Sequence, residues 1–409
     1  MRRIFAQVFV LSASLLALTL PALAQGGVVD NVLLRWVEPQ NRCDQNTTGD
    51  GATPRDMRAM LFVAMFEAVN AVAGKYQPFT EKIAAAPGSS PEAAAAQAAH
   101  DVLVKYCPKQ QREADGVLAS SLALVTESAA RASGVAVGQK AAAAIIAARA
   151  TARSTGLDGY YSPTTAGVYV PTSTQIGLGW SQSTPWVLRT ASELRSPAPP
   201  SLTSEIWSRD YEEVRRMGAK SGSARSEVQT DMGKFWPNRS VRIVLRQLVG
   251  LPGRSLVDDA RFLALAEMAW ADAYVALFEA KYAWNFWRPI TAIRGGALDG
   301  NDRTVPDADW TPLMETPLHP EYPCGHCVSS AAVGTVIRAE FGDRMPTIVI
   351  EIEGALMRRY PTAESYMDEV SESRLLAGAH YRFSLDAGKA MGVAIGKLAV
   401  ERFFRPASR

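Results

Sequence analysis

Apolar residues recur at α-helical spacing through most of this chain, and this periodicity restricts the fold more than any other feature of the sequence. In Arg55–Ala73 the apolar side chains repeat near every 3.6 residues, which predicts a helix with one buried stripe. Leu256–Tyr282 is the longest periodic stretch. Further helices are predicted over 91–106, 111–132 and 135–153, in broken form over 205–287, and from 325 onward. Strands find little support beyond 347–352, a β-branched run that fits a helix equally well. The pattern predicts an all-α bundle.

Two long loops interrupt the helices. Thr155–Leu202 is dense in Gly, Pro, Ser and Thr and contains Trp180 and Trp186. Because disordered segments are poor in aromatic residues, we predict that this loop is an ordered cover. A second loop, Gly295–Tyr322, is rich in Pro, Asp and Gly. Since no repeat and no domain boundary stand out, residues 25–409 are predicted to form one helical domain.

The N-terminus has the pattern of an export signal. Arg2 and Arg3 precede an apolar run, and Ala22-Leu23-Ala24 forms a small-x-small cleavage site. We therefore predict a signal peptide over 1–24 and a periplasmic or secreted mature protein; an uncleaved membrane anchor is the alternative. No later stretch reaches the roughly 20 apolar residues of a membrane span.

The charge balance excludes some partners. The 409 residues include 43 Lys and Arg against 41 Asp and Glu, a formal net charge of +2. Removal of Arg2 and Arg3 with the signal peptide would leave the mature chain near neutrality. Bulk charge therefore gives no support for a nucleic-acid or anionic-membrane partner. The oligomeric state stays open.

Four cysteines allow a further prediction about the exported chain. Cys324 and Cys327 form a C-x-x-C, whereas Cys43 and Cys107 are isolated. Because oxidation is permitted outside the cytoplasm, we expect disulfides Cys324–Cys327 and Cys43–Cys107, with free buried thiols as the alternative. The C-x-x-C before a helix is also typical of dithiol oxidoreductases, which gives an alternative function of another class.

Three short segments carry groups suited to an oxyanion. Lys281 and Arg288 are seven residues apart in an aromatic setting, so both cations share one helix face and require an opposite charge. Snorkelling or cation–π packing is the structural alternative. Cys324-Gly325-His326 precedes a strong helix pattern, and a helix N-terminus offers free amides to an anion.

The third segment contains Arg374 and His380, which bracket an apolar stretch with a glycine. An exposed cation and a buried, hydrogen-bonded imidazole are the alternative interpretation. Together with the first two segments, it supplies three cations, two imidazoles and helix amides, as a tetrahedral oxyanion requires.

The order and spacing of these segments resemble the vanadium-dependent haloperoxidases and the type 2 phosphatidic acid phosphatases, which form one superfamily. The pattern K-x6-R-P, then P-S-G-H, then S-R-x5-H is matched at 281–289, 323–326 and 373–380. The segments at 57–73 and 256–287 are also similar to the bacterial haloperoxidase-like branch, and the part that carries the motifs spans about 255–403. The resemblance implies an all-α fold with long ordered loops.

The resemblance also implies roles for these residues. Oxygen atoms of vanadate or phosphate would be held by five of them: Lys281, Arg288, Cys324, Gly325 and Arg374. His380 would be the axial ligand of vanadate, or the phosphorylated nucleophile of a phosphatase, and His326 the acid–base group. The cofactor would be vanadate for a peroxidase; a phosphatase needs none, because phosphate belongs to its substrate.

Two positions depart from the family pattern. Cys324 replaces the serine of the second segment and is a weaker hydrogen-bond donor. Ser384 stands where an aspartate usually follows the axial histidine, so the orienting partner of His380 is missing; Asp386 is the substitute that the sequence offers.

The leading prediction is an exported vanadate-dependent peroxidase that oxidises halide with hydrogen peroxide. The alternative is an acid phosphatase acting on a phosphate ester through a phosphohistidine, because a pentavalent phosphoryl transition state has the shape of bound vanadate. The aromatic segment 282–287 favours the peroxidase.

Overall fold

The computed structural model describes residues 31–46, 52–150, 164–171, 177–351 and 358–407. The predicted signal peptide lies outside the described residues. The α-helices are α1 (Val37–Asn46), α2 (Ala52–Ala73), α3 (Pro91–Tyr106), α4 (Gln111–Ala123), α5 (Ser128–Ala148), α6 (Glu205–Met217), α7 (Glu227–Phe235), α8 (Leu256–Trp284), α9 (Pro289–Arg294), α10 (Gly325–Phe341), α11 (Ala363–Leu376) and α12 (Arg382–Arg402). Short 3-10 helices include η3 (Leu178–Gln182), η4 (Trp236–Asn238) and η5 (Val241–Leu248).

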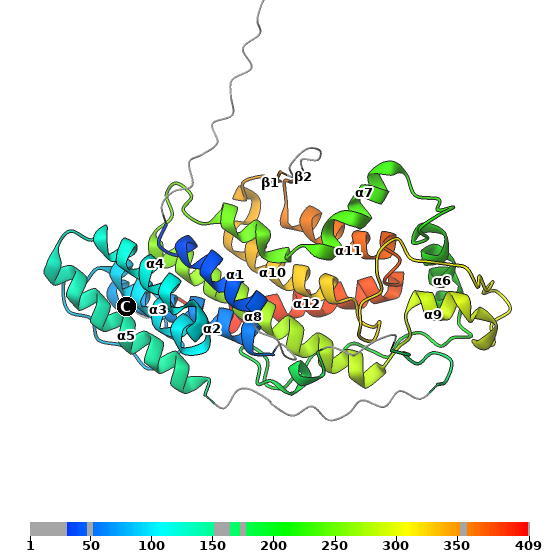
Figure 1. Ribbon diagram of the computed structural model, residues 1–409, viewed down its shortest axis with the longest axis horizontal. Coiled ribbons are helices and arrows are strands. Elements are labelled where there is room, and N and C mark those ends of the chain that lie inside the picture. The colour runs from blue at the N-terminus through cyan, green and yellow to red at the C-terminus, as the bar shows by residue number, and fades with distance from the viewer. Residues whose placement is uncertain (1–30, 47–51, 151–163, 172–176, 352–357, 408–409) are drawn as a thin grey trace, which may run out of the picture. The chain divides into compact units, whose positions relative to one another are not determined.

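The predicted all-α fold is confirmed (Figure 1). The described strands are β1 (Ile348–Ile350) and β2 (Arg358–Tyr360), which pair antiparallel. Within the run at 347–352, Ile348–Ile350 forms a strand, which is paired with β2, later in the chain, in a way that the pattern did not reveal. None of the described helices has the length and apolar character needed to cross a bilayer.

Most predicted helix positions agree with the structure, but one boundary was wrong. The sequence predicted helices over 111–132 and 135–153, whereas α4 ends at Ala123 and α5 begins at Ser128. The carboxylate of Glu127 accepts from the Ala129 amide and caps the start of α5. Alanine continues on both sides of this break, so hydrophobic periodicity gave no sign of it.

The helices pack in two neighbouring groups joined by α8. On one side α2, α3 and α5 contact one another, and on the other α10 packs against α12 and α11; α8 contacts both α2 and α10 (Figure 1). Gly392 on α12 allows close packing, because a Cβ there would lie 2.2 Å from the Val328 carbonyl oxygen of α10. The same helix pair brings the start of α12 beside Cys324, the N-cap of α10.

The first long loop is ordered in its described parts, as predicted. Trp180 and Trp186 are both buried. The carboxylate of Asp272 on α8 accepts from the backbone amides of Trp186, Val187 and Leu188, at 2.7–2.8 Å. This loop is therefore fastened to α8 at Asp272.

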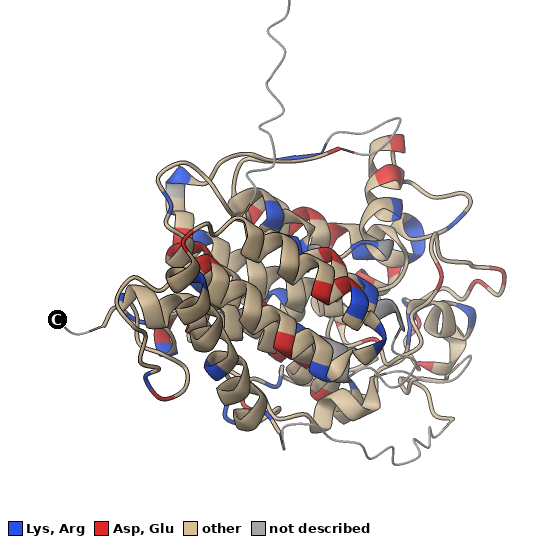
Figure 2. Cartoon of the chain, turned by 60° about the vertical axis from the view of Figure 1, so that its left-hand side comes forward, with Lys and Arg blue, Asp and Glu red and all other residues tan. Residues whose placement is uncertain are grey.

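Among the described residues visible in Figure 2, Lys and Arg are interspersed with Asp and Glu along the helices. One buried cluster joins α2, η5 and α8: Glu267 accepts from Arg58 at 2.8 Å and from Arg242 at 3.0 Å. Near one end of the chain, Cys43 on α1 and Cys107 after α3 are joined by a disulfide.

Candidate active site

The three sequence segments meet at one end of α8. Lys281 lies in the last turn of α8, Arg288 caps α9, and Gly325 and His326 begin α10. Arg374 lies in the last turn of α11, and His380 follows it in the connection to α12. A cavity of about 770 Å³ adjoins them; at this end it is lined by Gly325, His326, Arg374, His380 and His319.

Arg374 has unmatched hydrogen-bond donors beside this cavity. Its side chain is 3% exposed, and neither Nε nor one terminal nitrogen has a hydrogen-bond partner within the protein. Burial, followed by the charge of Arg288, lowers the pKa of Arg374 to about 9. A buried guanidinium without a counter-charge is unfavourable, so an anion in the cavity would satisfy it.

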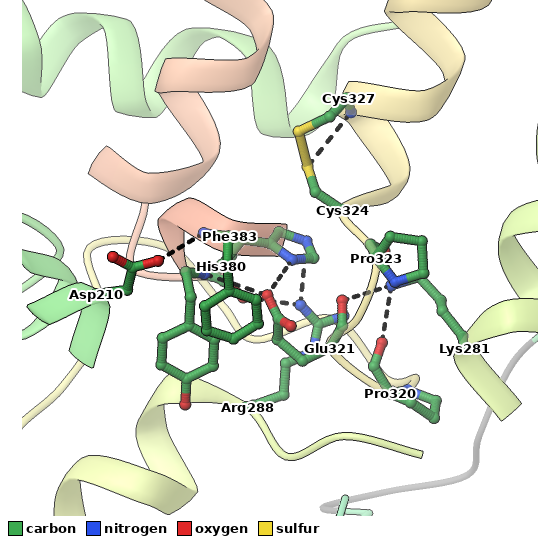
Figure 3. Close-up of polar contacts among 12 residues, drawn as sticks. Asp210, Lys281, Arg288, Pro320, Glu321, Pro323, Cys324, Cys327, His380 and Phe383 are labelled. Atoms are coloured by element: carbon green, nitrogen blue, oxygen red, sulfur yellow. Dashed lines mark hydrogen bonds and ion pairs between the residues drawn. A yellow bond between two sulfur atoms is a disulfide. The ribbon is translucent and has the colours of Figure 1, made fainter. Parts of the chain in front are cut away.

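Lys281 lies behind the cavity rather than in its lining. Its side chain is fully buried, and Nζ donates to the carbonyl oxygens of Pro320, Glu321 and Pro323 at 2.9, 2.7 and 2.6 Å (Figure 3). Three acceptors match the three hydrogens of an ammonium group. The residue expected to bind an oxyanion therefore holds the loop that precedes α10. Burial, followed by the charge of Arg288, lowers the pKa of Lys281, while the three carbonyl acceptors favour its charged form.

Arg288 is similarly engaged. Nε donates to the His319 carbonyl oxygen at 3.0 Å, and one terminal nitrogen donates to the Ala379 carbonyl at 2.9 Å. The terminal nitrogens also contact Nε2 of His380 at 3.2 Å and Nδ1 of His319 at 3.0 Å. Because a guanidinium only donates, Nε2 of His380 accepts from Arg288; Nδ1 of His319 also lies 3.1 Å from the Pro320 carbonyl oxygen, to which a protonated Nδ1 would donate. Burial lowers the pKa of Arg288 to about 10.

His380 is held from its other side by Glu321. Nδ1 of His380 lies 2.7 Å from Oε1 of Glu321, which also accepts from the Tyr381 amide at 3.2 Å (Figure 3). Since Nε2 accepts from Arg288, the proton of a neutral imidazole lies on Nδ1 and is donated to the carboxylate. Burial, followed by the charges of Arg288 and Lys281, lowers the pKa of His380.

Glu321, and not Asp386 as suggested from the sequence, is the carboxylate that orients the His380 ring. Asp386 is exposed and lies on a separate surface beside Lys389, so that suggestion was wrong. Glu321 is fully buried, and burial raises the pKa of its carboxyl to about 7 against the lowering effect of Lys281 and Arg288. The hydroxyl of Ser384 lies close enough to lower this pKa but has no hydrogen bond of ordinary geometry.

Sequence reasoning missed both Glu321 and His319. The signal for His319 was its rarity, as one of four histidines only seven residues before His326. The signal for Glu321 was a carboxylate between two prolines, directly before the second segment. Neither signal indicated a contact with His380 or Arg288, because these residues lie far apart in the chain.

Cys324 caps α10 through its sulfur. Sγ accepts from the Cys327 amide at 3.3 Å and is bonded to the Cys327 sulfur, so it carries no hydrogen to donate to an anion. Both cysteines are fully buried. The all-α setting and the inaccessible sulfurs give no support to the dithiol enzyme. Gly325 instead presents its backbone at the start of the helix, where amides lack helical partners.

His326 faces the cavity from the first turn of α10. The Trp236 carbonyl hydrogen-bonds the imidazole, while burial and the charge of Arg374 lower the pKa of His326 by more than this bond raises it. The ring is therefore neutral, with one nitrogen donating to Trp236 and the other left as an acceptor.

The arrangement suits an anion rather than a bare cation. Among the described residues, no group of three or more His, Cys, Asp or Glu side chains is placed to hold a metal ion. The cavity end instead combines the unmatched donors of Arg374, the charges of Lys281 and Arg288, and a helix N-terminus. These features fit a tetrahedral oxyanion such as vanadate or phosphate.

Comparisons with known proteins point to one family. Residues 261–408 match a family model described as the VCPO second helical-bundle domain. Vanadium chloroperoxidase from Curvularia inaequalis is 24% identical over 262 residues, which are 47% of this chain and 43% of that protein. The chain thus matches less than half the length of this curated relative.

Solved structures share the fold over nearly the whole chain. The structure of the first bacterial vanadium-dependent iodoperoxidase superposes with a TM-score of 0.72 at 21% identity, covering 92% of this chain and 97% of that one. A holo-type bacterial vanadium-dependent chloroperoxidase gives a TM-score of 0.71 at 17% identity, covering 91% and 97%.

Proposed function

We propose that this chain, which has the fold of the vanadium-dependent haloperoxidases, is an exported vanadate-dependent peroxidase that oxidises a halide with hydrogen peroxide. The resemblance drawn from the three sequence segments is confirmed by the family model and the relatives. The observation that carries the proposal is the pair of unmatched, buried Arg374 donors beside a neutral His380 whose Nε2 is an acceptor.

The residues present fit vanadate. Arg374 and the amides at the start of α10 would hold its oxygens, and Nε2 of His380, which accepts from Arg288 in this structure, would exchange that contact for vanadate and be its protein ligand. Bound vanadate would supply a Lewis acid that activates hydrogen peroxide toward the halide.

The remaining residues orient His380, add positive charge and supply an acid–base group at this end of the cavity. Glu321 and Arg288 fix the His380 ring in the tautomer that leaves the Nε2 lone pair unprotonated. Lys281 and Arg288 add positive charge that attracts anions and keeps both imidazoles neutral. The acceptor nitrogen of His326 would accept a proton from hydrogen peroxide in the cavity and donate a proton again later in turnover.

An acid phosphatase is the second candidate, since the same observation supports it. A phosphoryl group has the charge and shape that Arg374 and the α10 amides accept, and the unprotonated Nε2 of His380 has the lone pair of a nucleophile. Attack would form a P–N bond and break the ester P–O bond, and the alcohol would leave with a proton; water would then hydrolyse the phosphohistidine with His326 as the base.

One experiment separates the two candidates. The purified protein is assayed, with and without orthovanadate, for peroxide-dependent iodide and bromide oxidation and for p-nitrophenyl phosphate hydrolysis. The peroxidase predicts halide oxidation only with vanadate; the phosphatase predicts hydrolysis that vanadate inhibits. His380→Ala should abolish either activity together with anion binding, whereas His326→Ala should keep binding and lower turnover by roughly 10²–10⁴-fold. Absence of both activities in the loaded protein would contradict the proposal.

Export forms part of the same proposal. It rests on the basic residues, apolar run and small-x-small site of 1–24. Expression of the full chain in a bacterial host should yield a periplasmic or secreted form whose N-terminal residue is Gln25. An intact N-terminus in the membrane fraction would support the uncleaved anchor instead.

A further inference from the structure

One face of α12 is left uncovered by the rest of the described structure. Asp386, Ala390 and Lys397 are exposed on it, and Val393 and Ala394 are half-buried. Spacings of four, three and four residues lead from Asp386 through Ala390 and Val393 to Lys397, which places these positions along one side of the helix. Other sides of α12 pack against α10 and α8. A surface hollow follows the uncovered face, and all six residues that line it belong to α12: Asp386, Lys389, Ala390, Val393, Ala394 and Lys397.

The charges at the two ends of this face, Asp386 and Lys397, have no partner side chain. Within the residues that the structure describes, neither forms a hydrogen bond or an ion pair. Arg382 lies near Asp386 but is already paired with two other carboxylates, and Lys389 is paired with Asp368 on α11. Asp386 and Lys397 cannot reach one another, because eleven residues of helix hold them about 16 Å apart along the axis.

The order of residues on this face is complementary to itself when reversed. Asp386 lies as far before the midpoint of the face, between positions 391 and 392, as Lys397 lies after it. Ala390 and Val393 flank the same midpoint at equal distances. Two copies of α12 packed antiparallel about a twofold axis at this point would therefore place Asp386 of each copy opposite Lys397 of the other. The same operation places Ala390 opposite Val393.

Side-chain size and charge both favour this antiparallel pair. Alanine at 390 and 394 lets two helices approach to the about 8–10 Å of ordinary helix packing, so that Val393 of one copy fits the hollow over Ala390 of the other. A parallel pair would instead place each end charge opposite its own kind, and like charges across an interface are unfavourable. Lys389, the remaining charge of the hollow, would face Ala394 and is neutralised by Asp368. The charges therefore select a second copy of this chain as the occupant.

We propose that the uncovered face of α12 is a homodimer interface, in which two chains pack α12 antiparallel and form two ion pairs between Asp386 and Lys397. A single helix pair is a small interface beside the roughly 1,200 Å² or more of standard protein–protein interfaces, so we expect a weak dimer with a micromolar dissociation constant. None of the residues of this face lines the cavity at the candidate active site, so each copy keeps its own site and its own affinity for anions.

Sedimentation equilibrium of the purified protein measures the association. We expect a monomer–dimer equilibrium that weakens as salt rises from about 50 to about 500 mM, because exposed ion pairs are screened. Lys397→Glu turns both attractions into repulsions and should raise the dissociation constant at least about 10-fold. The double variant Asp386→Lys with Lys397→Asp reverses the pair and should restore association. Lys140→Glu is the matched control, because it makes the same charge change at an exposed position of α5 and should leave the dissociation constant unchanged.

Zero-length cross-linking identifies the paired residues. A carbodiimide joins a carboxylate to an ammonium group as an amide; the water that is lost converts the reagent to a urea, and no spacer atoms are added. Because Asp386 and Lys397 lie about 16 Å apart within one chain, a link between them can form only between two copies. We expect mass spectrometry of the cross-linked dimer to find peptide 383–389 joined to peptide 390–402 at these two residues.

Three results would each overturn the proposal. The first is a native protein that stays monomeric at every accessible concentration, which would leave the face to a different partner or to solvent. The second is a dimer that Lys397→Glu leaves intact, which would place the interface on another surface. The third is a folded double variant that fails to associate. Circular dichroism and phosphate affinity should match the native protein in all variants, so that a loss of association is distinguished from unfolding.

Discussion

Glu321 and His380 form a buried pair, with Oε1 2.7 Å from Nδ1, in which the carboxylate fixes the proton of the ring. Arg288 donates to the opposite ring nitrogen, so His380 is clamped between an acceptor and a donor. A carboxylate four residues after the histidine would do this from within one helix. Here the carboxylate comes from a loop almost sixty residues earlier, one that Lys281 holds through three carbonyls.

Glu321→Ala should weaken anion binding. Loss of the carboxylate frees the imidazole to change tautomer and orientation, and comparable losses around metal ligands reduce affinity about 10–100-fold. Phosphate and orthovanadate titrations measure the change, and nitrogen NMR of His380 should report a mixed tautomer. Glu321→Gln keeps an acceptor for Nδ1 and should recover part of the affinity. Asp386→Asn is the control, and an equal effect there would contradict the assignment.

Arg374→Met should stabilise the anion-free protein while abolishing its response to anions. The native guanidinium is buried with unmatched donors, and replacing such a charge by an apolar side chain is often neutral or stabilising. In the native protein, phosphate at a hundred times its dissociation constant should add about 2.7 kcal/mol, which raises Tm by a few degrees. Scanning calorimetry with and without phosphate checks both effects. If phosphate raised the Tm of the variant as much as that of the native protein, Arg374 would not be part of the anion site.

His326 and His100 should make contributions to the stability of the fold that depend on pH in opposite directions. The pKa of His326 is lower in the folded protein than in the unfolded chain. Its contribution to the free energy of unfolding is therefore complete above about pH 6.5. This contribution is lost as pH falls, because the unfolded chain binds the proton first. The pKa of His100 is raised by its hydrogen bonds to Asp101 and Asp115, so its contribution is complete below about pH 6.5 and is lost as pH rises through the raised value.

The variants His326→Gln and His100→Gln test these signs. Between pH 7.5 and 5.5 the native protein should lose more stability than His326→Gln, by at most about 1.4 kcal/mol per pH unit. Over the same fall in pH, the free energy of unfolding of the native protein should increase relative to that of His100→Gln. Urea denaturation at several pH values provides the measurement, and parallel pH profiles for all three proteins would contradict the pKa directions.

Removing the Cys324–Cys327 pair should affect stability more than function. A bridge across so short a loop contributes at most about 2 kcal/mol through chain entropy. In Cys324→Ser with Cys327→Ala, the serine hydroxyl can cap α10 and also donate to an anion, so activity should be retained or increased. Mass spectrometry of the unreduced native protein should find no alkylatable thiol. Free thiols would show that the native protein has no such disulfide. An inactive double variant would indicate that the sulfurs have a direct role in activity.

By itself the sequence determined the class of fold and identified most of the residues that line the candidate site. Helical periodicity is a local property, so 91–106 and 256–282 were predicted within a few residues of α3 and α8. Arg374, Gly325, His326 and His380 were identifiable because each lies in a short segment whose residue types and spacing carry the chemistry.

Only the tertiary structure decided how those residues divide their tasks. Whether Lys281 faces an anion or the carbonyls of 320–323 depends on the path of a loop that has no periodicity. The partner of His380 could not be found by counting residues along α12, because Glu321 reaches it from a separate segment. Local patterns specify helices and candidate groups, whereas hydrogen-bond partners and cavities arise from contacts between distant segments, which no spacing in the chain encodes.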